Sequence, residues 1–569
     1  MESFAKLKRR GTDLLNSVSQ NMPSMPSMPH MPHMPQMPHM PRMGGGPTMK
    51  GTWQHIALPP LPRSSHTLDI IAGNAYIFGG EVEARKPVDN DMHIIVLPSS
   101  GANADYYAVK AKPSPKTQAP ATITEEDETA AQLKDPLTEV PLSSPPPPGT
   151  SFEEQPSSST TEKGKGKPLP SDVPSPRIGH ASAVIGPRIF IFGGRTSPAG
   201  SDTLDEGGRV WVFETKTHTW SYLDPYRTSP SPPPRSYFAA VATDKPSDFA
   251  IKPLRRTSSW KEWAEGDSAE VGIPQRPITG HIAAGATDDE DAGFGTFIIH
   301  GGCLADGSRT SDVWAFDVRS CTWKELPSAP GPARGGAALA IAKSRLYRFG
   351  GFDGEKELGG QLDVLELSLD EFDDRVSRGE IGVFARGEWS SHYPPVTASP
   401  PPSQQDQEAG GDDPAAEPTI QDTARLIETE AWPAARSVSS LNLVLGGGGR
   451  EYLVLMLGER SASASGHEAA GSFHGDVWTF QVPPLGMTAA SVTDAVLQAV
   501  GRKTGEGVWT RVATGPEDED EALDVKGPTP RGWIASATLG DLGENAVMVF
   551  GGLSEGNQRL GDGWIFRLG

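Results

Sequence analysis

The most regular feature of the chain is a short apolar run that ends in two glycines. These doublets lie at Gly79–Gly80, Gly193–Gly194, Gly301–Gly302, Gly350–Gly351 and Gly551–Gly552. A sixth apolar run, "LVLMLGE", matches them with Glu459 in place of the second glycine. Because two residues without Cβ let the chain turn tightly, each doublet predicts the end of a buried strand.

Each doublet is followed by an alternating segment and then by a further strand, which usually contains Trp. Alternation of apolar and polar residues, as in "DVWAFD" from Asp312, predicts a strand with two different faces. The Trp-containing strands lie at Trp220, Trp323, Trp389 and Trp509, and "DYYAV" near Tyr107 is the weakest case. With the strand that precedes each doublet, these segments predict six antiparallel blades of four strands.

The repeating unit resembles the kelch motif, whose period is about 50 residues. The resemblance implies an all-β fold, a six-bladed kelch β-propeller related to the central domain of galactose oxidase. The sixth unit has no fourth strand after "DGWIFRL", whereas "TWQHIAL" at Thr52–Leu58 has the sequence of such a strand. We therefore expect the ring to be closed by this N-terminal strand, which removes both open sheet edges.

The first strand of the third blade is ambiguous. Either "YFAAVATD" from Tyr237 or "GHIAAGATD" from Gly280 has the required pattern. A seventh blade in this region is not expected, because neither a doublet nor a third strand accompanies Trp260 and Trp263.

Several segments lie outside the predicted ring, which spans residues 51–569. Residues 1–50 form a basic, Met-Pro-rich tail, and low-complexity insertions at about 98–176, 245–290 and 395–430 are expected to be disordered. The Met-Pro-x repeat at 22–43 is either a proline-rich spacer or a Met/His strip for a soft metal. Residues 1–20 are either a frayed tail or a helix that contacts a membrane surface or a partner.

Composition restricts the classes of function. The 569-residue chain has a net charge of −21, which disfavours nucleic-acid binding. Two cysteines give no disulfide framework, and Cys303 and Cys321 are expected at opposite ends of a blade and therefore unbonded. With no apolar run of about 20 residues and no signal-peptide pattern, the sequence predicts a cytoplasmic protein.

A closer resemblance is carried by "RSSHTLDIIAGNAYIFGGE", "PARGGAALAIAKSRLYRFGGFDG" and "PRGWIASATLGDLGENAVMVFGG". These strings resemble blades of the plant nitrile-specifier, epithiospecifier and thiocyanate-forming proteins. That branch redirects the breakdown of glucosinolate aglycones with Fe(II), held by a Glu-x3-Asp-x3-His motif after the fifth doublet. The resemblance implies Glu459 and His467 as outer metal ligands here, with Ser463 at the position of the family's Asp.

Serine is a poor third ligand for Fe(II), so this departure puts the metal in doubt. His474 or Glu468 would have to substitute in a rearranged loop. The alternative is a solvated Ser/Ala-rich loop in which Glu459 merely replaces a turn glycine.

A second candidate set is the arginine that opens each first strand. Such residues either ring the upper face of the propeller and attract an anionic ligand, or form structural hydrogen bonds at the strand starts. The residues are Arg63, Arg177, Arg235, Arg334, Arg436 and Arg531.

Two hypotheses about function remain. The first is a protein-interaction or ligand-binding module, more consistent with a non-enzyme, that presents loops to an unknown protein partner or a small anionic ligand. The second is an Fe(II)-dependent, specifier-like protein or small-molecule enzyme with a site at Glu459 and His467. Neither a phosphate-binding glycine loop nor a nucleophile elbow occurs in the sequence.

Overall fold

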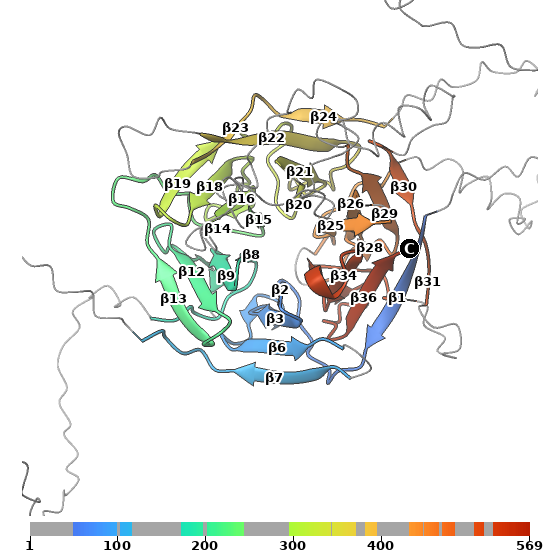
Figure 1. Ribbon diagram of the computed structural model, residues 1–569, viewed down its shortest axis with the longest axis horizontal. Helices are drawn as coiled ribbons and strands as arrows, with labels where there is room; N and C mark the ends of the chain where they lie inside the picture. Colours follow the sequence, from blue (N-terminus) through green and yellow to red (C-terminus); the bar gives the residue numbers. More distant parts are fainter. Residues whose placement is uncertain are drawn as a thin grey trace, which may run out of the picture. The chain divides into compact units, whose positions relative to one another are not determined.

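The computed structural model describes residues 49–98, 103–115, 172–196, 202–243, 295–342, 344–370, 382–394, 432–447, 449–465, 469–483, 506–516 and 527–569. Residues 1–48 of the expected tail, the expected insertions at 245–290 and 395–430, and His467 lie outside these residues. Of the first expected insertion, at 98–176, residues 98, 103–115 and 172–176 are described and include the strand Asp105–Val109. Thr48–Gly569 forms a single compact unit. Its described part consists of strands and one short 3-10 helix, η4 (Gly540–Leu542), arranged as blades around a central axis (Figure 1).

Each blade is an antiparallel meander whose first strand lies nearest the axis. Blade 1 contains β2 (Thr67–Ile71), β3 (Asn74–Phe78), β6 (Met92–Val96) and β7 (Asp105–Val109). Blade 2 contains β8 (Ala181–Ile185), β9 (Arg188–Phe192), β12 (Val210–Glu214) and β13 (Thr219–Leu223). Blade 3 contains β15 (Ala239–Thr243), β16 (Thr296–His300), β18 (Val313–Asp317) and β19 (Thr322–Leu326).

The remaining blades keep this order with small variations. Blade 4 contains β20 (Ala338–Ala342), β21 (Arg345–Phe349) and β22 (Leu362–Asp370), and β22 pairs with both β23 (Gly382–Ala385) and β24 (Ser390–His392). Blade 5 contains β25 (Ser440–Gly446), β26 (Arg450–Met456), β29 (Val477–Gln481) and β30 (Trp509–Arg511). Blade 6 contains β33 (Ala535–Thr538), β34 (Ala546–Phe550) and β36 (Gly563–Leu568).

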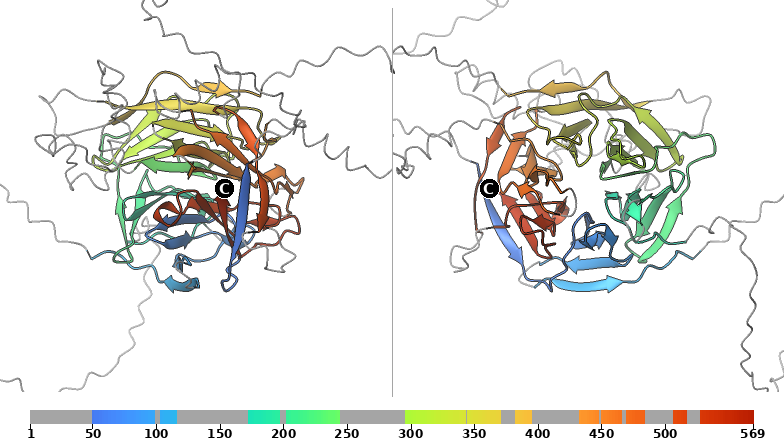
Figure 2. Two further views of the ribbon diagram at one scale, coloured as in Figure 1. Left: turned by 45° about the vertical axis from the view of Figure 1, so that its right-hand side comes forward. Right: turned by 180° about the vertical axis from the view of Figure 1, so that it is seen from behind.

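The predicted closure by an N-terminal strand is confirmed. Strand β1 (Lys50–Ile56) pairs antiparallel with β36, from Gly51 opposite Leu568 to Ile56 opposite Gly563. Outside it, β31 (Ala513–Pro516) pairs parallel with β1, so β1 is an interior strand of a five-stranded blade. Figure 2 shows β1, in blue, along the outer side of the red strands of blade 6.

The ambiguity in the third blade is resolved by β15. This strand belongs to the "YFAAVATD" segment and pairs with β16 from Ala239 opposite His300 to Thr243 opposite Thr296. The alternative segment from Gly280 lies outside the described residues.

The hydrophobic core lies between neighbouring blades. Between blades 2 and 3, for example, Phe190 and Phe192 pack with Phe297, Phe316 and Trp323. Trp323 is 2% exposed, and its indole N–H donates to Gly208 O across the blade interface at 2.8 Å. The outer Trp therefore joins two blades through both its ring and its polar atom.

The glycine doublets are needed for backbone conformation and for close approach. Gly79 and Gly80 have φ values of 63° and 94°, and a Cβ on Gly79 would lie 2.5 Å from Arg177 O of the next blade. In blade 5 the equivalent residues are Leu457, at φ 59°, and Gly458, at φ 105°. The expectation that Glu459 replaces the second glycine is therefore wrong, because Leu457 replaces the first and Glu459 follows the pair.

Candidate functional site

The six strand-opening arginines lie inside the blades, not on the surface. Each is between 0% and 3% exposed. In every blade the Nη1 group donates to the carbonyl oxygen of the first residue of the doublet, for example from Arg63 to Gly79 O at 2.9 Å and from Arg436 to Leu457 O at 3.0 Å. The same contact is made by Arg177, Arg235, Arg334 and Arg531.

Four of these arginines also bind an acidic residue that precedes the third strand. The pairs are Arg177–Glu206, Arg235–Asp312, Arg436–Asp476 and Arg531–Asp562, each with two nitrogen–oxygen contacts of 2.6–3.1 Å. Each acid also accepts a hydrogen bond from a Trp indole of its own blade. These contacts match the expectation that the arginines form structural hydrogen bonds at the strand starts. The guanidinium groups therefore lie inside the blades.

The residue after each doublet lies on the face that carries the doublets, here called the upper face. It pairs with the residue that follows the strand-opening arginine, as in Ser64 with Glu81 and Ser437 with Glu459. The six equivalent residues are Glu81, Arg195, Cys303, Phe352, Glu459 and Leu553. Five of these six residues line a cavity on the upper face, namely Glu81, Cys303, Phe352, Glu459 and Leu553.

Below these residues a closed ring of backbone hydrogen bonds surrounds the axis. One residue of each blade, in a left-handed conformation, donates its N–H to the carbonyl oxygen of the equivalent residue in a neighbouring blade, at 2.7–3.2 Å. The ring residues are Ser65, Gly179, Tyr237, Gly336, Val438 and Trp533. Their side chains separate an upper cavity from a central channel, and both spaces are lined by Tyr237, Val438 and Trp533.

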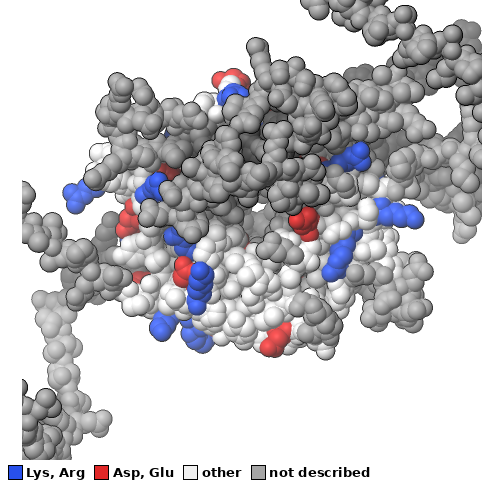
Figure 3. Space-filling view, in the orientation of Figure 1, with Lys and Arg blue, Asp and Glu red and all other residues white. Residues whose placement is uncertain are grey.

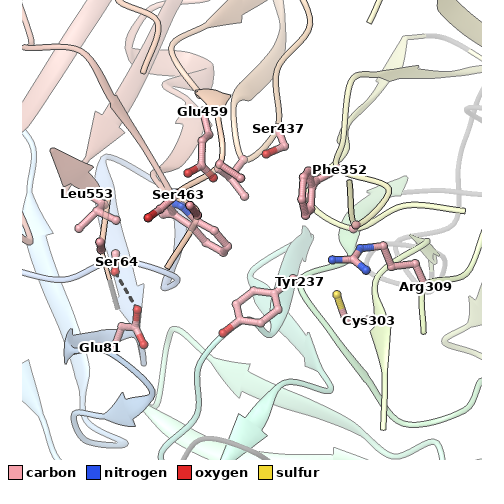
Figure 4. Close-up of a pocket in the computed structure, with 18 of the residues that line it drawn as sticks. Ser64, Glu81, Tyr237, Cys303, Arg309, Phe352, Ser437, Glu459, Ser463 and Leu553 are labelled. Carbon is pink, nitrogen blue, oxygen red and sulfur yellow. Dashed lines mark hydrogen bonds between the residues drawn. The ribbon is translucent and has the colours of Figure 1, made fainter. Parts of the chain in front are cut away.

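The upper cavity has a volume of about 290 Å³. The rings of Tyr237 and Trp533 meet edge to face, with their centroids 5.4 Å apart. Phe352 and Glu459 face the cavity from blades 4 and 5, and Cys303 faces it from blade 3 (Figure 4). The cavity therefore combines aromatic side chains with a few polar groups, as small-molecule sites commonly do.

Glu459 is the most unusual polar group of the cavity. The residue is 6% exposed, and burial raises the pKa of its carboxyl to about 7, although a hydrogen bond from the Trp533 side chain opposes the shift. Burial also raises the pKa of the neighbouring Glu357 to about 8, and the charge of Glu459 adds to that shift. A cavity carboxyl that titrates near neutrality can donate or accept a proton and can bind as either acid or carboxylate.

The other charged groups of the cavity are arginines and a paired carboxylate. Arg559 donates to Glu81 at 3.3 Å, and both side chains are 8% exposed. The guanidinium carbon of Arg309 lies 5.1 Å from the centre of the Phe352 ring, and its buried Nε has no hydrogen-bond partner among the residues that the structure describes. Arg309 therefore brings a positive charge to the cavity wall beside an aromatic ring.

The predicted metal ligands are only partly described. Glu459 and Ser463 both line the cavity, whereas His467 and Glu468 lie outside the described residues. His474 has its Nε2 at 3.1 Å from Ala435 O, so its ring bonds to the backbone of its own blade. No group of three His, Cys, Asp or Glu side chains that could hold a metal ion occurs among the residues that the structure describes. Glu459 and Ser463 alone do not fit Fe(II).

The cysteine prediction is confirmed, since Cys303 and Cys321 are both free. Cys303 faces the cavity, and burial raises the pKa of its thiol. Cys321 precedes β19, where its thiol lies 3.8 Å from Val318 O. The two thiols therefore have different surroundings, and only the first reports on the cavity.

Sequence comparison identifies the repeating unit. The kelch motif matches residues 176–225 and 295–330. The chain is 24% identical over 412 residues to N-(sulfonatooxy)prop-2-enimidothioate sulfolyase from Thlaspi arvense, covering 70% of this chain and 94% of the relative. It is 26% identical over 205 residues to the Rab9 effector protein with kelch motifs from Mus musculus, covering 33% of this chain and 50% of that relative.

Two further comparisons are more distant. The human Kelch domain-containing protein 3 is 24% identical over 211 residues, and the chain spans 53% of it. A solved structure titled "Structure of YjhT" aligns with 89% of this chain and 95% of its own at 10% identity, with a TM-score of 0.42. The described residues include no helix long and apolar enough to span a membrane. The motif, the six blades and these relatives confirm the predicted kelch-repeat propeller and its resemblance to the specifier branch.

Proposed function

We propose that this kelch-repeat six-bladed β-propeller is a ligand-binding module, and that its upper cavity takes a small molecule with an apolar body and one polar group. The buried Glu459 carboxyl in the cavity wall is the observation that supports the proposal. An ionised carboxylate out of water costs stability unless it is compensated, so a carboxyl at this position indicates a use beyond packing.

The size and lining of the cavity define the ligand. About 290 Å³ is at the lower end of the range for small-molecule sites. Tyr237, Trp533 and Phe352 offer ring surfaces to an apolar body, whereas Glu459 and Arg309 offer polar contacts to one group. In Figure 3 the charged side chains on the visible described surface are scattered.

Binding is favoured over covalent catalysis. The raised pKa of Cys303 keeps its thiol mainly protonated at neutral pH, which makes it a weak nucleophile. Tyr237 likewise has a pKa raised by burial.

The cytoplasmic location remains a prediction, and so does the flexible tail of residues 1–50.

Because Cys303 lines the cavity, the rate at which its thiol is alkylated can report whether a ligand occupies the cavity. In the full-length protein, benzyl alcohol, benzylamine and benzoate are probes of one shape and three charges. We expect at least one of them to slow alkylation of Cys303 by N-ethylmaleimide severalfold without changing the rate at Cys321, as measured by mass spectrometry. In Trp533→Ala the protection should disappear, because the ring that holds the probe is removed.

The control for this experiment is Trp389→Ala, a Trp of blade 4 outside the cavity. It should retain the protection. If none of the three probes protects Cys303 in preference to Cys321, the cavity does not bind small aromatic molecules and the proposal fails. Protection by a peptide or protein alone would assign the cavity to a partner's side chain instead.

A second candidate is an Fe(II)-dependent, specifier-like protein. It is supported by the similarity over 94% of the sulfolyase and by the position of Glu459 in the cavity wall. Under this proposal Glu459 and His467 would bind the metal weakly, since Ser463 supplies no negative charge.

Anaerobic calorimetric titration with Fe(II) tests the second candidate. Ser463→Asp is expected to bind Fe(II) about tenfold or more tightly than wild type, because it restores a carboxylate ligand. His467→Ala should bind more weakly than wild type. Identical binding in the three proteins, or none in any of them, would show that this loop is not a metal site.

A further inference from the structure

Below the ring of backbone hydrogen bonds lies a second space, the central channel, with a volume of about 720 Å³. The first strand of every blade lines it, as the innermost strands in Figure 1 indicate. It shares only the ring side chains with the upper cavity, so Glu459 and Arg309 do not face it. Its chemistry can therefore be considered independently of the function proposed above.

The channel wall is divided into an apolar sector and a polar sector. Blades 3 and 4 contribute only apolar side chains below the ring, from Phe238–Ala242 and Ala337–Ile341. Blades 1, 2, 5 and 6 contribute Asp69, Ser182, Asn442 and Ser536, among others. The sequence alone does not show this division, because the residues that form it lie on the first strands of different blades.

Asp69 is the only Asp, Glu, Lys or Arg among the described residues that line the channel. It is 6% exposed, and Ser182 Oγ of the neighbouring blade donates to its Oδ2 at 2.6 Å. The two channel histidines do not add charge, since burial lowers the pKa of His180 to about 3 and that of His66 well below its usual value. One carboxyl group thus determines the charge of the channel.

Asn442 lies at the same depth as Asp69. Each is four residues after the ring residue of its blade, Val438 and Ser65 respectively, in a parallel position along the first strand. The Asn442 amide donates to Ser440 Oγ at 2.6 Å and to Ser536 Oγ at 2.9 Å, which leaves its carbonyl oxygen as an acceptor. Blade 6 lies between the blades of Asp69 and Asn442, so the carboxylate and the amide oxygen are separate acceptors at one level of the channel. Of the two, the carboxylate is the one that suits a hydrogen-bond donor of positive charge.

From this arrangement we propose that the channel is a second binding site, for a protonated amine on an aliphatic chain. The ammonium group binds at the level of Asp69 and Asn442, and the aliphatic chain lies against the apolar sector of blades 3 and 4. A primary ammonium has three donors, of which one suits the Asp69 carboxylate and another the adjacent Ser182 hydroxyl. Burial raises the pKa of Asp69 to about 7, and a bound cation would favour its ionised form.

Calorimetric titration of the full-length protein with n-hexylamine at pH 7.5 tests this site. We expect binding to be about tenfold weaker in Asp69→Asn, because a charged hydrogen bond is replaced by a neutral one. n-Hexanol and hexanoate, which have the same chain without the cation, should bind wild type more weakly than n-hexylamine. Asn442→Asp adds a second carboxylate at the same level and should tighten amine binding.

Glu459→Gln is the control that separates the two sites. It should leave unchanged the part of n-hexylamine binding that Asp69→Asn weakens, whatever the upper cavity binds. Equal binding of n-hexylamine to wild type, Asp69→Asn and Asn442→Asp would overturn the channel proposal, as would equal affinity for n-hexanol. Loss of binding in Glu459→Gln would place the amine in the upper cavity instead.

Discussion

A chain that lacks residues 1–60 is expected to aggregate or to melt far below the full-length protein, whereas one that lacks residues 1–45 is expected to melt within a few degrees of it. The longer deletion removes Trp53 and Ile56, which are 5% and 2% exposed. It also separates β36 from β31, since β1 lies between them. Loss of two large core side chains costs at least about 5 kcal/mol, and β36 becomes an open edge.

Thermal unfolding and size-exclusion chromatography of the two truncated proteins measure this effect. The shorter deletion ends before Lys50, the first residue of β1, and therefore keeps every strand contact of blade 6. Equal melting temperatures for the two proteins would contradict closure by β1.

Arg436→Met is expected to destabilise the protein by about 3–5 kcal/mol, because it leaves the Asp476 carboxylate buried without its partner. Arg436 contacts both oxygens of Asp476, at 2.7 and 3.1 Å, and this ion pair helps to lower the pKa of Asp476 to about 2 against its burial. Urea denaturation at pH 7 measures the loss of unfolding free energy.

Arg334→Met is the matched control for this ion pair. Arg334 occupies the same position in blade 4, but its contacts run to backbone oxygens of Gly350, Pro332 and Pro330. It should be less destabilising, since no bound carboxylate is left behind. Equal losses in the two variants would mean that the ion pair adds nothing to the backbone hydrogen bonds.

The two variants should also differ in their response to acid. A carboxyl whose folded pKa is below its unfolded pKa stabilises the folded state above the unfolded value, and that contribution is lost as pH falls through the folded value. For Asp476 this loss of stability is expected between about pH 4, near the unfolded pKa, and about pH 2, near the folded pKa. The difference between wild type and Arg436→Met should therefore shrink below pH 4, whereas that for Arg334→Met should not follow the same window.

The blades and their order could be predicted because their signals are local. Alternation with a period of two and a glycine at a left-handed position depend on neighbours in the chain, as at "DVWAFD" and Gly79–Gly80. The closing strand was predictable for the same reason, since "TWQHIAL" has the pattern of the strand that the sixth unit lacks. The Arg and Asp residues also repeat along the sequence, but the ion pairs between them become evident only in the structure.

The cavity and the channel were decided by the tertiary structure. Glu459 was predicted as a metal ligand or a turn residue, and its place after the doublet emerged only from its pairing with Ser437 and its hydrogen bond with Trp533. Asp69 gave no signal in its strand, because its partner Ser182 is 113 residues away. The sequence by itself determined the six blades, since these follow from contacts within a unit, and it indicated their closure, since the sixth unit lacks a strand whose pattern occurs at Thr52–Leu58. Only the tertiary structure decided which side chains share the axis, because each blade contributes one residue at each level and the ring brings those residues together.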